Sequence, residues 1–240
     1  MKILILLVTV VLALGQGVRP ANSVGSGGAI TTSFVQAATT TSGGINIPIN
    51  GVVPGDMLVA YTSWTSADTI TSCTGTGANW VVGPQTFDAV PTVSVGSCYA
   101  LNVSGGNLTV TFTFSGSDVP RGSFVLEYSG VAPFNAVDGT TSNINSGNQT
   151  VDGTICGAIP TTANGDLITA LVLDTSTPGG PTVFSAGTGY TLRVQRSGGG
   201  QVIDVSEEDL TESVSGPITP TFTSSNNDRN ACIALALKHA

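Results

Sequence analysis

Charged side chains and histidine are scarce in this 240-residue chain. Charged residues make up only 9% of the sequence, and 7 basic residues stand against 15 acidic ones. Proteins that bind nucleic acid present clustered Lys and Arg side chains. The one close basic pair, Arg193 and Arg196, would face opposite sides of a strand. We therefore exclude nucleic acid as a partner.

The scarcity of histidine excludes several catalytic mechanisms. His239 is the single histidine, and it lies one residue from the C-terminus, a poor place to hold a general base. This disfavours a Ser-His-Asp triad and a zinc centre. A carboxylate pair could still serve a glycoside hydrolase, but we interpret Glu127, inside an apolar strand, as a snorkelling side chain on the wet face. We expect no enzyme, and glycoside hydrolysis is the least favoured function.

One apolar run, from Ile3 to Leu14, stands out in the chain. It follows Lys2 and ends at a small-x-small cleavage motif, although cleavage after Gly17 or Ser23 also fits. A membrane span takes about 20 apolar residues, so a retained anchor is disfavoured, and no other stretch could cross a bilayer. We predict a signal peptide over residues 1–17, a flexible tail over 18–30, and a secreted protein located outside the cell or at its surface.

Cysteine is scarce as well, and no C-x-x-C pair suggests metal binding. In an exported protein the four cysteines would form disulfides, and four cysteines allow three connectivities. If two halves of the chain fold independently, the favoured pairs are Cys73–Cys98 and Cys156–Cys232.

The abundant residues are apolar ones, at 40%, and glycine, at 31 positions. A repeat is visible among them: Gly55-Asp56-Met57 returns as Gly165-Asp166-Leu167, an offset of 110 residues. The same offset carries Thr111-Phe112-Thr113 onto Thr221-Phe222-Thr223. We interpret this as an internal duplication of a unit of domain size. The predicted organisation is a first domain over 31–132, a linker over 133–146 and a second domain over 147–240.

Short apolar or alternating stretches bounded by Gly, Pro, Ser and Asn predict strands throughout, and no window shows sustained helical periodicity. Asn107 to Phe114 alternates cleanly, which indicates one buried and one wet face. We predict an all-β protein of two tandem β-sandwich domains, of jelly-roll or immunoglobulin-like type, related by the duplication. The clearest expected strands are Ser33–Ala37, Met57–Trp64, Ser123–Tyr128, Asp166–Leu173 and Ala231–Lys238.

Acidic residues offer the candidate metal sites. The Gly-Asp pairs at Asp56 and Asp166 either form turns into strands, with Gly at positive φ, or help to hold Ca²⁺. A turn needs these residue types with or without an ion, so the turn is favoured. A second acidic group is either a solvated loop or a calcium site. It consists of Asp204, Glu207, Glu208 and Asp209, with Glu212 close behind. No other cofactor is expected.

Three aromatic residues are candidate platforms for glycans: Trp64, Trp80 and Tyr190. We interpret Trp80 and Tyr190 as core-filling residues first and sugar platforms second. Three Asn-x-Ser/Thr triplets, at Asn102, Asn107 and Asn148, fit N-glycosylation, at about the number that chance supplies in so Ser- and Thr-rich a chain.

The segments Gly55 to Trp64 and Phe124 to Val131 resemble strands of secreted bacterial β-sandwich repeat proteins of unassigned activity. The resemblance covers most of residues 31–240 and implies an extracellular context, without catalytic residues. The function we expect is a structural or adhesive one, as in a subunit of an extracellular filament or surface layer. Such a protein would associate with itself through sheet edges, with the segment Ile30–Ala37 donated to a neighbour. The alternative is a carbohydrate-binding module that uses an exposed Trp64 or Trp80.

Overall fold

The structure, a computed structural model, describes residues 31–40, 44–89, 92–117, 120–145, 156–174, 182–196, 204–225 and 229–240. The expected signal peptide and tail, residues 1–30, and the triplet at Asn148 lie outside the described residues. Every regular element within the described ranges is a β-strand, and the strands pair antiparallel. The prediction of an all-β fold is confirmed.

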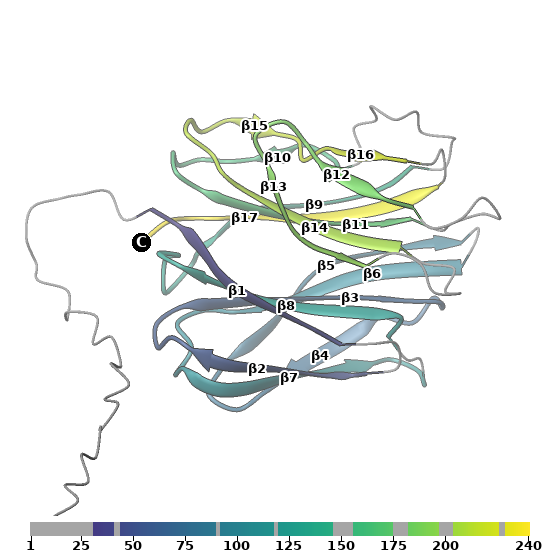
Figure 1. Ribbon diagram of the computed structural model, residues 1–240, viewed down its shortest axis with the longest axis horizontal. Coiled ribbons are helices and arrows are strands. Elements are labelled where there is room, and N and C mark those ends of the chain that lie inside the picture. The colour runs from purple at the N-terminus through teal and green to yellow at the C-terminus, as the bar shows by residue number, and fades with distance from the viewer. Residues whose placement is uncertain are drawn as a thin grey trace, which may run out of the picture.

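Two five-stranded sheets form the centre of the molecule (Figure 1). The first inner sheet contains, in spatial order, β1 (Ser33–Thr40), β8 (Gly122–Ser129), β3 (Met57–Trp64), β6 (Thr92–Ala100) and β5 (Trp80–Ala89). The second inner sheet contains β13 (Thr191–Arg196), β14 (Asp204–Thr211), β11 (Leu167–Asp174), β17 (Asn230–Leu237) and β9 (Val137–Asn145).

Smaller layers cover the outer face of each inner sheet. The outer sheet, next to the first inner sheet, contains β2 (Asn46–Val52), β7 (Gly106–Phe114) and β4 (Ile70–Thr74). Two ribbons lie against the second inner sheet. One pairs β10 (Ile159–Pro160) with β15 (Pro217–Ile218), and the other pairs β12 (Phe184–Ala186) with β16 (Phe222–Ser224). Figure 1 shows the resulting stack of four layers.

Three hydrophobic clusters fill the spaces between the four layers. The central cluster lies between the two inner sheets and draws on both halves of the chain. The other two lie beneath the outer sheet and beneath the ribbons. Members of the central cluster include Val59, Tyr61, Leu126, Leu171 and Ile233. Because both inner sheets are covered on both faces, β3 and β11 are buried at every residue, whereas β7 alternates.

The two halves of the chain have the same strand order. The strands β1, β8, β3, β6 and β5 correspond to β9, β17, β11, β14 and β13. Met57 and Leu167, which begin β3 and β11, lie at the offset of 110 residues seen in the sequence. The last strand departs from it by one residue, because Met57 pairs with Tyr128 but Leu167 pairs with Leu237. The duplication itself stays a prediction, which the shared strand order supports.

The segment expected to link two domains, 133–146, is not a free connector. It contains β9, which pairs with β17 along the edge of the second inner sheet. The prediction missed this strand because its sequence is mostly Thr, Ser, Asn and Gly and carries few apolar residues. The two halves are therefore stacked on a shared hydrophobic cluster rather than held apart by a linker.

Both predicted disulfides are confirmed, and each ties an inner sheet to its cover. Cys73 in β4 bonds Cys98 in β6, which joins the outer sheet to the first inner sheet. Cys156, just before β10, bonds Cys232 in β17, which joins the ribbon layer to the second inner sheet. The sequence separations are 25 and 76 residues.

We predict unequal losses of stability when the two disulfides are removed. The longer loop restricts the unfolded chain more, so replacing Cys156 and Cys232 with alanine lowers the free energy of unfolding by about 4.5 kcal/mol, against about 3.5 kcal/mol for Cys73 and Cys98. Urea unfolding of the disulfide-bonded protein, followed by tryptophan fluorescence, measures both values. A larger loss for the Cys73–Cys98 variant would contradict this account.

Candidate functional site

The predicted acidic group lies on β14, beside the central strand of the second inner sheet. The solvated-loop interpretation is wrong, because Asp204, Glu207, Glu208 and Asp209 are each no more than 4% exposed. Alternation along the strand directs Glu207 and Asp209 toward the first inner sheet and Asp204 and Glu208 toward the ribbon layer. The four carboxyl groups therefore belong to two separate buried networks.

Glu207 connects the two inner sheets through hydroxyl groups. Thr169 Oγ1 donates a hydrogen bond to Glu207 Oε1 at 2.6 Å, and the Tyr128 hydroxyl donates to the same oxygen at 3.1 Å. The Tyr61 hydroxyl lies 3.0 Å from Thr169 Oγ1. Burial raises the pKa of Glu207 to about 8, and the nearby Asp209 adds to the rise. The carboxyl group is thus largely protonated at neutral pH, which lowers the cost of burying it.

Asp209 belongs to a second contact between the sheets. Arg193 Nε donates a hydrogen bond to Asp209 Oδ2 at 2.8 Å. The Arg193 guanidinium lies 4.5 Å from the centre of the Phe34 ring, a cation–π contact that joins β13 to β1. The Phe34 ring meets Tyr128 edge to face, with 5.8 Å between the ring centres. These contacts close the side of the stack at which β1 and β13 meet.

The other two acids serve the ribbon layer. Asp204 accepts a hydrogen bond from the backbone N–H of Thr182 at 2.6 Å, and Glu208 accepts one from Gly187 at 2.9 Å. Burial raises the pKa of Glu208 to about 8. The predicted calcium ligands thus point to two faces of one strand. Within the part of the chain that the structure describes, no group of three or more His, Cys, Asp or Glu side chains could hold a metal ion.

Both Gly-Asp pairs form the predicted turns. Gly55 and Gly165 adopt φ values of +92° and +85°, which glycine tolerates and residues with a Cβ do not. The N–H of Gly55 donates to the Val103 carbonyl at 2.8 Å, and that of Gly165 donates to the Glu212 carbonyl at 3.1 Å. The structural interpretation of the two glycines is confirmed.

Asp166 forms a carboxyl pair with Asp138. Burial raises the pKa of Asp166 to about 7, and the charge of the neighbouring Asp138 carboxyl group adds to the rise. Burial opposes ionisation of Asp138 too, but hydrogen bonds from Thr162 and from Lys238 hold its pKa well below the usual range. Lys238 Nζ lies 3.1 Å from Asp138 Oδ1. Asp166 is 0% exposed and the Asp138 side chain is 3% exposed, so this pair is not presented to a polysaccharide.

The C-terminus is held more firmly than its position in the sequence predicts. His239 forms a β-bridge with Val131, and the Ala240 N–H donates to the Gly130 carbonyl at 2.8 Å. The Nδ1 atom of His239 is nevertheless buried without a hydrogen-bond partner. A triad base has a carboxylate on Nδ1, so His239 lacks the group that would orient it.

The three aromatic residues considered as sugar platforms pack into the protein. Trp64 is 1% exposed, and its Nε1 donates to the Asp68 carbonyl at 2.9 Å. Trp80 packs on the cluster beneath the outer sheet, and Tyr190 packs on the cluster beneath the ribbons. The prediction that an exposed Trp64 binds glycans is wrong, since sheet packing encloses the ring. Glu127 is likewise 0% exposed rather than on a wet face, and its Oε1 accepts from the Val53 N–H at 2.7 Å.

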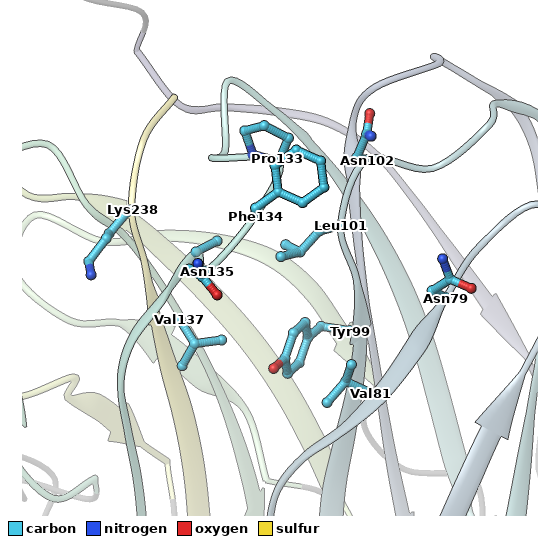
Figure 2. A pocket seen from close by; sticks show the side chains of 11 residues that line it. Asn79, Val81, Tyr99, Leu101, Asn102, Pro133, Phe134, Asn135, Val137 and Lys238 are labelled. Atoms are coloured by element: carbon cyan, nitrogen blue, oxygen red, sulfur yellow. The ribbon is translucent and has the colours of Figure 1, made fainter.

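An open groove of about 620 Å³ lies where β5, β6 and the segment before β9 meet (Figure 2). Figure 2 shows Phe134 beside Leu101 at one end, and Tyr99 beside Val81 further along. Sequence reasoning missed this groove because its walls come from four separate segments of the chain. Its lining includes Asn79, Val81, Tyr99, Leu101, Asn102, Phe134 and Asn135.

Two of the predicted glycosylation sites fall within the described residues. Asn102 and Asn107 are both exposed, so a modifying enzyme could reach them. Asn107 Oδ1 accepts a hydrogen bond from the Gly51 N–H at 3.1 Å, whereas Asn102 lines the groove.

Comparisons of the chain with protein-family models, with curated proteins and with solved structures gave no match. Among the described residues, none forms a helix with the length and hydropathy of a membrane span.

We predict that the protein is more stable at mildly acidic pH than at alkaline pH. The pKa of Glu207 rises from an unfolded value of 4.5 to about 8 in the folded protein, so folding favours the protonated form. This stabilisation is complete below the unfolded pKa and is lost as the pH rises through the folded one. Glu208 acts in the same direction. By calorimetry, the melting temperature should fall by several degrees between acidic and alkaline buffer, at about 2–4 °C per kcal/mol.

The variant Glu207→Gln tests the source of this pH dependence. It keeps an oxygen that accepts from Thr169 and Tyr128 but cannot ionise, so the fall in melting temperature should become smaller. Asp68→Asn, which neutralises a carboxyl group in a loop outside the inner sheets, is the control and should keep the wild-type slope. Identical slopes for Glu207→Gln and the wild type would contradict the role of Glu207.

Proposed function

We propose that the protein is exported and acts as a non-enzymatic structural or adhesive protein that associates with copies of itself. The observation that supports this most is the position of the acidic side chains. Glu207 and Glu208 are enclosed between layers, where their hydrogen bonds join parts of the fold. Two disulfides fasten the covers of the stack, and disulfides are typical of proteins outside the reducing cytosol.

The free edge of β1 is the surface that we propose for self-association. The segment expected to be donated to a neighbour, Ile30–Ala37, overlaps β1, and Ser33–Thr40 pairs with β8 of the same chain. The strand β1 is nevertheless the last in its sheet, and it contains neither a charged residue nor a proline. Val35 on this strand is 37% exposed. An uncharged edge strand is open to pairing with a strand of another molecule.

Glycan binding at the cell surface is the second candidate function. The buried ring of Trp64 cannot provide the platform expected from the sequence. Phe134, which is 74% exposed at the groove of Figure 2, is the observation that favours this candidate.

We predict that the mature protein forms oligomers or filaments at high concentration, and that Val35→Lys weakens this association at least severalfold. A lysine on the edge of β1 would place a hydrated charge where a second strand must pair. Size-exclusion chromatography with light scattering, together with electron microscopy, measures the effect. The matched control is Val183→Lys, at a site that is 49% exposed and outside β1. A strictly monomeric wild-type protein would refute self-association, and equal assembly of the two variants would refute the use of β1.

A further inference from the structure

We propose that the groove lined by Tyr99, Phe134 and three asparagines binds a neutral saccharide. The volume of about 620 Å³ lies within the range of about 300–1,000 Å³ that is usual for small-molecule sites. Asn79, Asn102, Phe134 and Asn135 of its lining are exposed, so the groove is open to solvent, as the binding of an extended ligand requires.

The apolar part of the groove suits the C–H face of a sugar ring. Phe134 is 74% exposed and Val81 is 47% exposed, so both present apolar surface to solvent. Tyr99 and Leu101 are half-buried and pack on the central cluster, which fixes their positions. Aromatic rings offer large, rigid apolar surface with a defined orientation. A ligand that covers Phe134 and Tyr99 would remove this surface from water.

The polar part of the groove suits hydroxyl groups. Asn79, Asn102 and Asn135 are all exposed on the groove, and each amide can both donate and accept hydrogen bonds, as a sugar hydroxyl does. Asn102 and Asn135 both have φ of 50°, and within the described ranges they are the two non-glycine residues at positive φ. Glycine would take this conformation without strain. Both positions instead carry an amide, and both lie on the groove.

The charge of the groove favours a neutral ligand. Although the chain has 15 acidic residues, no Asp or Glu is among the described residues that line the groove. Lys238 is the charged residue of the lining, and its Nζ is paired with Asp138 at 3.1 Å. Figure 2 shows the Lys238 side chain at the margin, separated from Tyr99 by Val137 and Asn135. Amide groups therefore supply most of the hydrogen bonding.

The corresponding position in the second half provides an internal comparison. Val81, Tyr99 and Leu101 correspond by the offset to Thr191, Asp209 and Thr211, which line a smaller hollow of about 310 Å³. There the Arg193–Asp209 ion pair and the Phe34 ring occupy the site, with Thr32 Oγ1 2.8 Å from Thr211 Oγ1. Side chains of both halves thus fill this position, whereas the equivalent position at the groove stays open and aromatic.

The groove is distinct from the surface proposed for self-association. The strands β5 and β6 lie at one side of the first inner sheet, and β1 lies at the opposite edge. Saccharide binding and self-association can therefore be tested separately. Phe134→Ala and Asn135→Gly test saccharide binding, and Val35→Lys tests self-association.

The test measures binding of cellohexaose, mannohexaose and chitohexaose to the mature full-length protein by calorimetry, with hexagalacturonate as the acidic comparison. The protein is produced in a host that adds no N-glycans, because a glycan on Asn102 would cover the groove. At least one neutral hexasaccharide should bind at micromolar to low-millimolar concentration. Phe134→Ala should lower that affinity by about tenfold, as expected for loss of an aromatic anchor. Asn135→Gly should lower it severalfold without loss of stability, since glycine accepts the positive φ.

Val183→Ala is the matched control, because Val183 is an exposed apolar side chain outside the groove, and it should bind like the wild type. The unchanged melting temperature of each variant shows that the fold is intact. Three results would overturn the proposal: no neutral hexasaccharide binds at low-millimolar concentration, only hexagalacturonate binds, or Phe134→Ala and Asn135→Gly bind as the wild type does.

Discussion

The packing of the two inner sheets against each other is the interaction on which the rest of the structure depends. It buries the central part of one face of each sheet in a single hydrophobic cluster. Along the stack, β1 lies against β13, where Phe34 meets Arg193, and β8 lies against β14, where Tyr128 meets Glu207. The strand β3 lies against β11, where Tyr61 meets Thr169. β1 corresponds to β9, and β13 corresponds to β5. The contacts between the two halves are therefore reciprocal, as in a two-fold symmetric dimer, although both halves belong to one chain.

This packing explains how a chain with few charges can place several of its acids inside. A carboxyl group between two sheets is tolerated when it is protonated or hydrogen-bonded, and Glu207 meets both conditions. The two halves also attach their outer layers to the inner sheets by different chemistry. Cys98 and Glu208 occupy equivalent positions 110 residues apart. Cys98 holds the outer sheet by a disulfide, whereas Glu208 holds the ribbon layer through the Gly187 N–H.

The sequence predicted the features that depend on local pattern. The all-β class, the two disulfides and the turns at Gly55 and Gly165 follow from alternation, cysteine spacing and glycine chemistry. Features set by the neighbour across a sheet could not be predicted. An acidic run such as that at Glu207 usually indicates a solvent-exposed segment, whereas here hydrogen bonds from Tyr128 and Thr169, distant in sequence, help to accommodate the buried Glu207 carboxyl group. The strand β9 was missed for a related reason, because its polar residues form a strand by pairing with β17.

The reciprocal packing of the two halves also determines where an open surface can form. The end of β14 lies next to β1, and the end of β6, the strand that corresponds to β14, lies next to β9. We call these two equivalent places the junctions of the stack. At one junction, Phe34, Arg193 and Asp209 fill the space and fasten the edge of the stack. At the other junction, the Lys238–Asp138 ion pair lies at the margin of the groove, and Phe134 is 74% exposed. Since one filled junction and the central cluster already join the sheets, the second junction is free to differ. Two halves with the same strand order can thus use one junction for stability and leave the equivalent junction open.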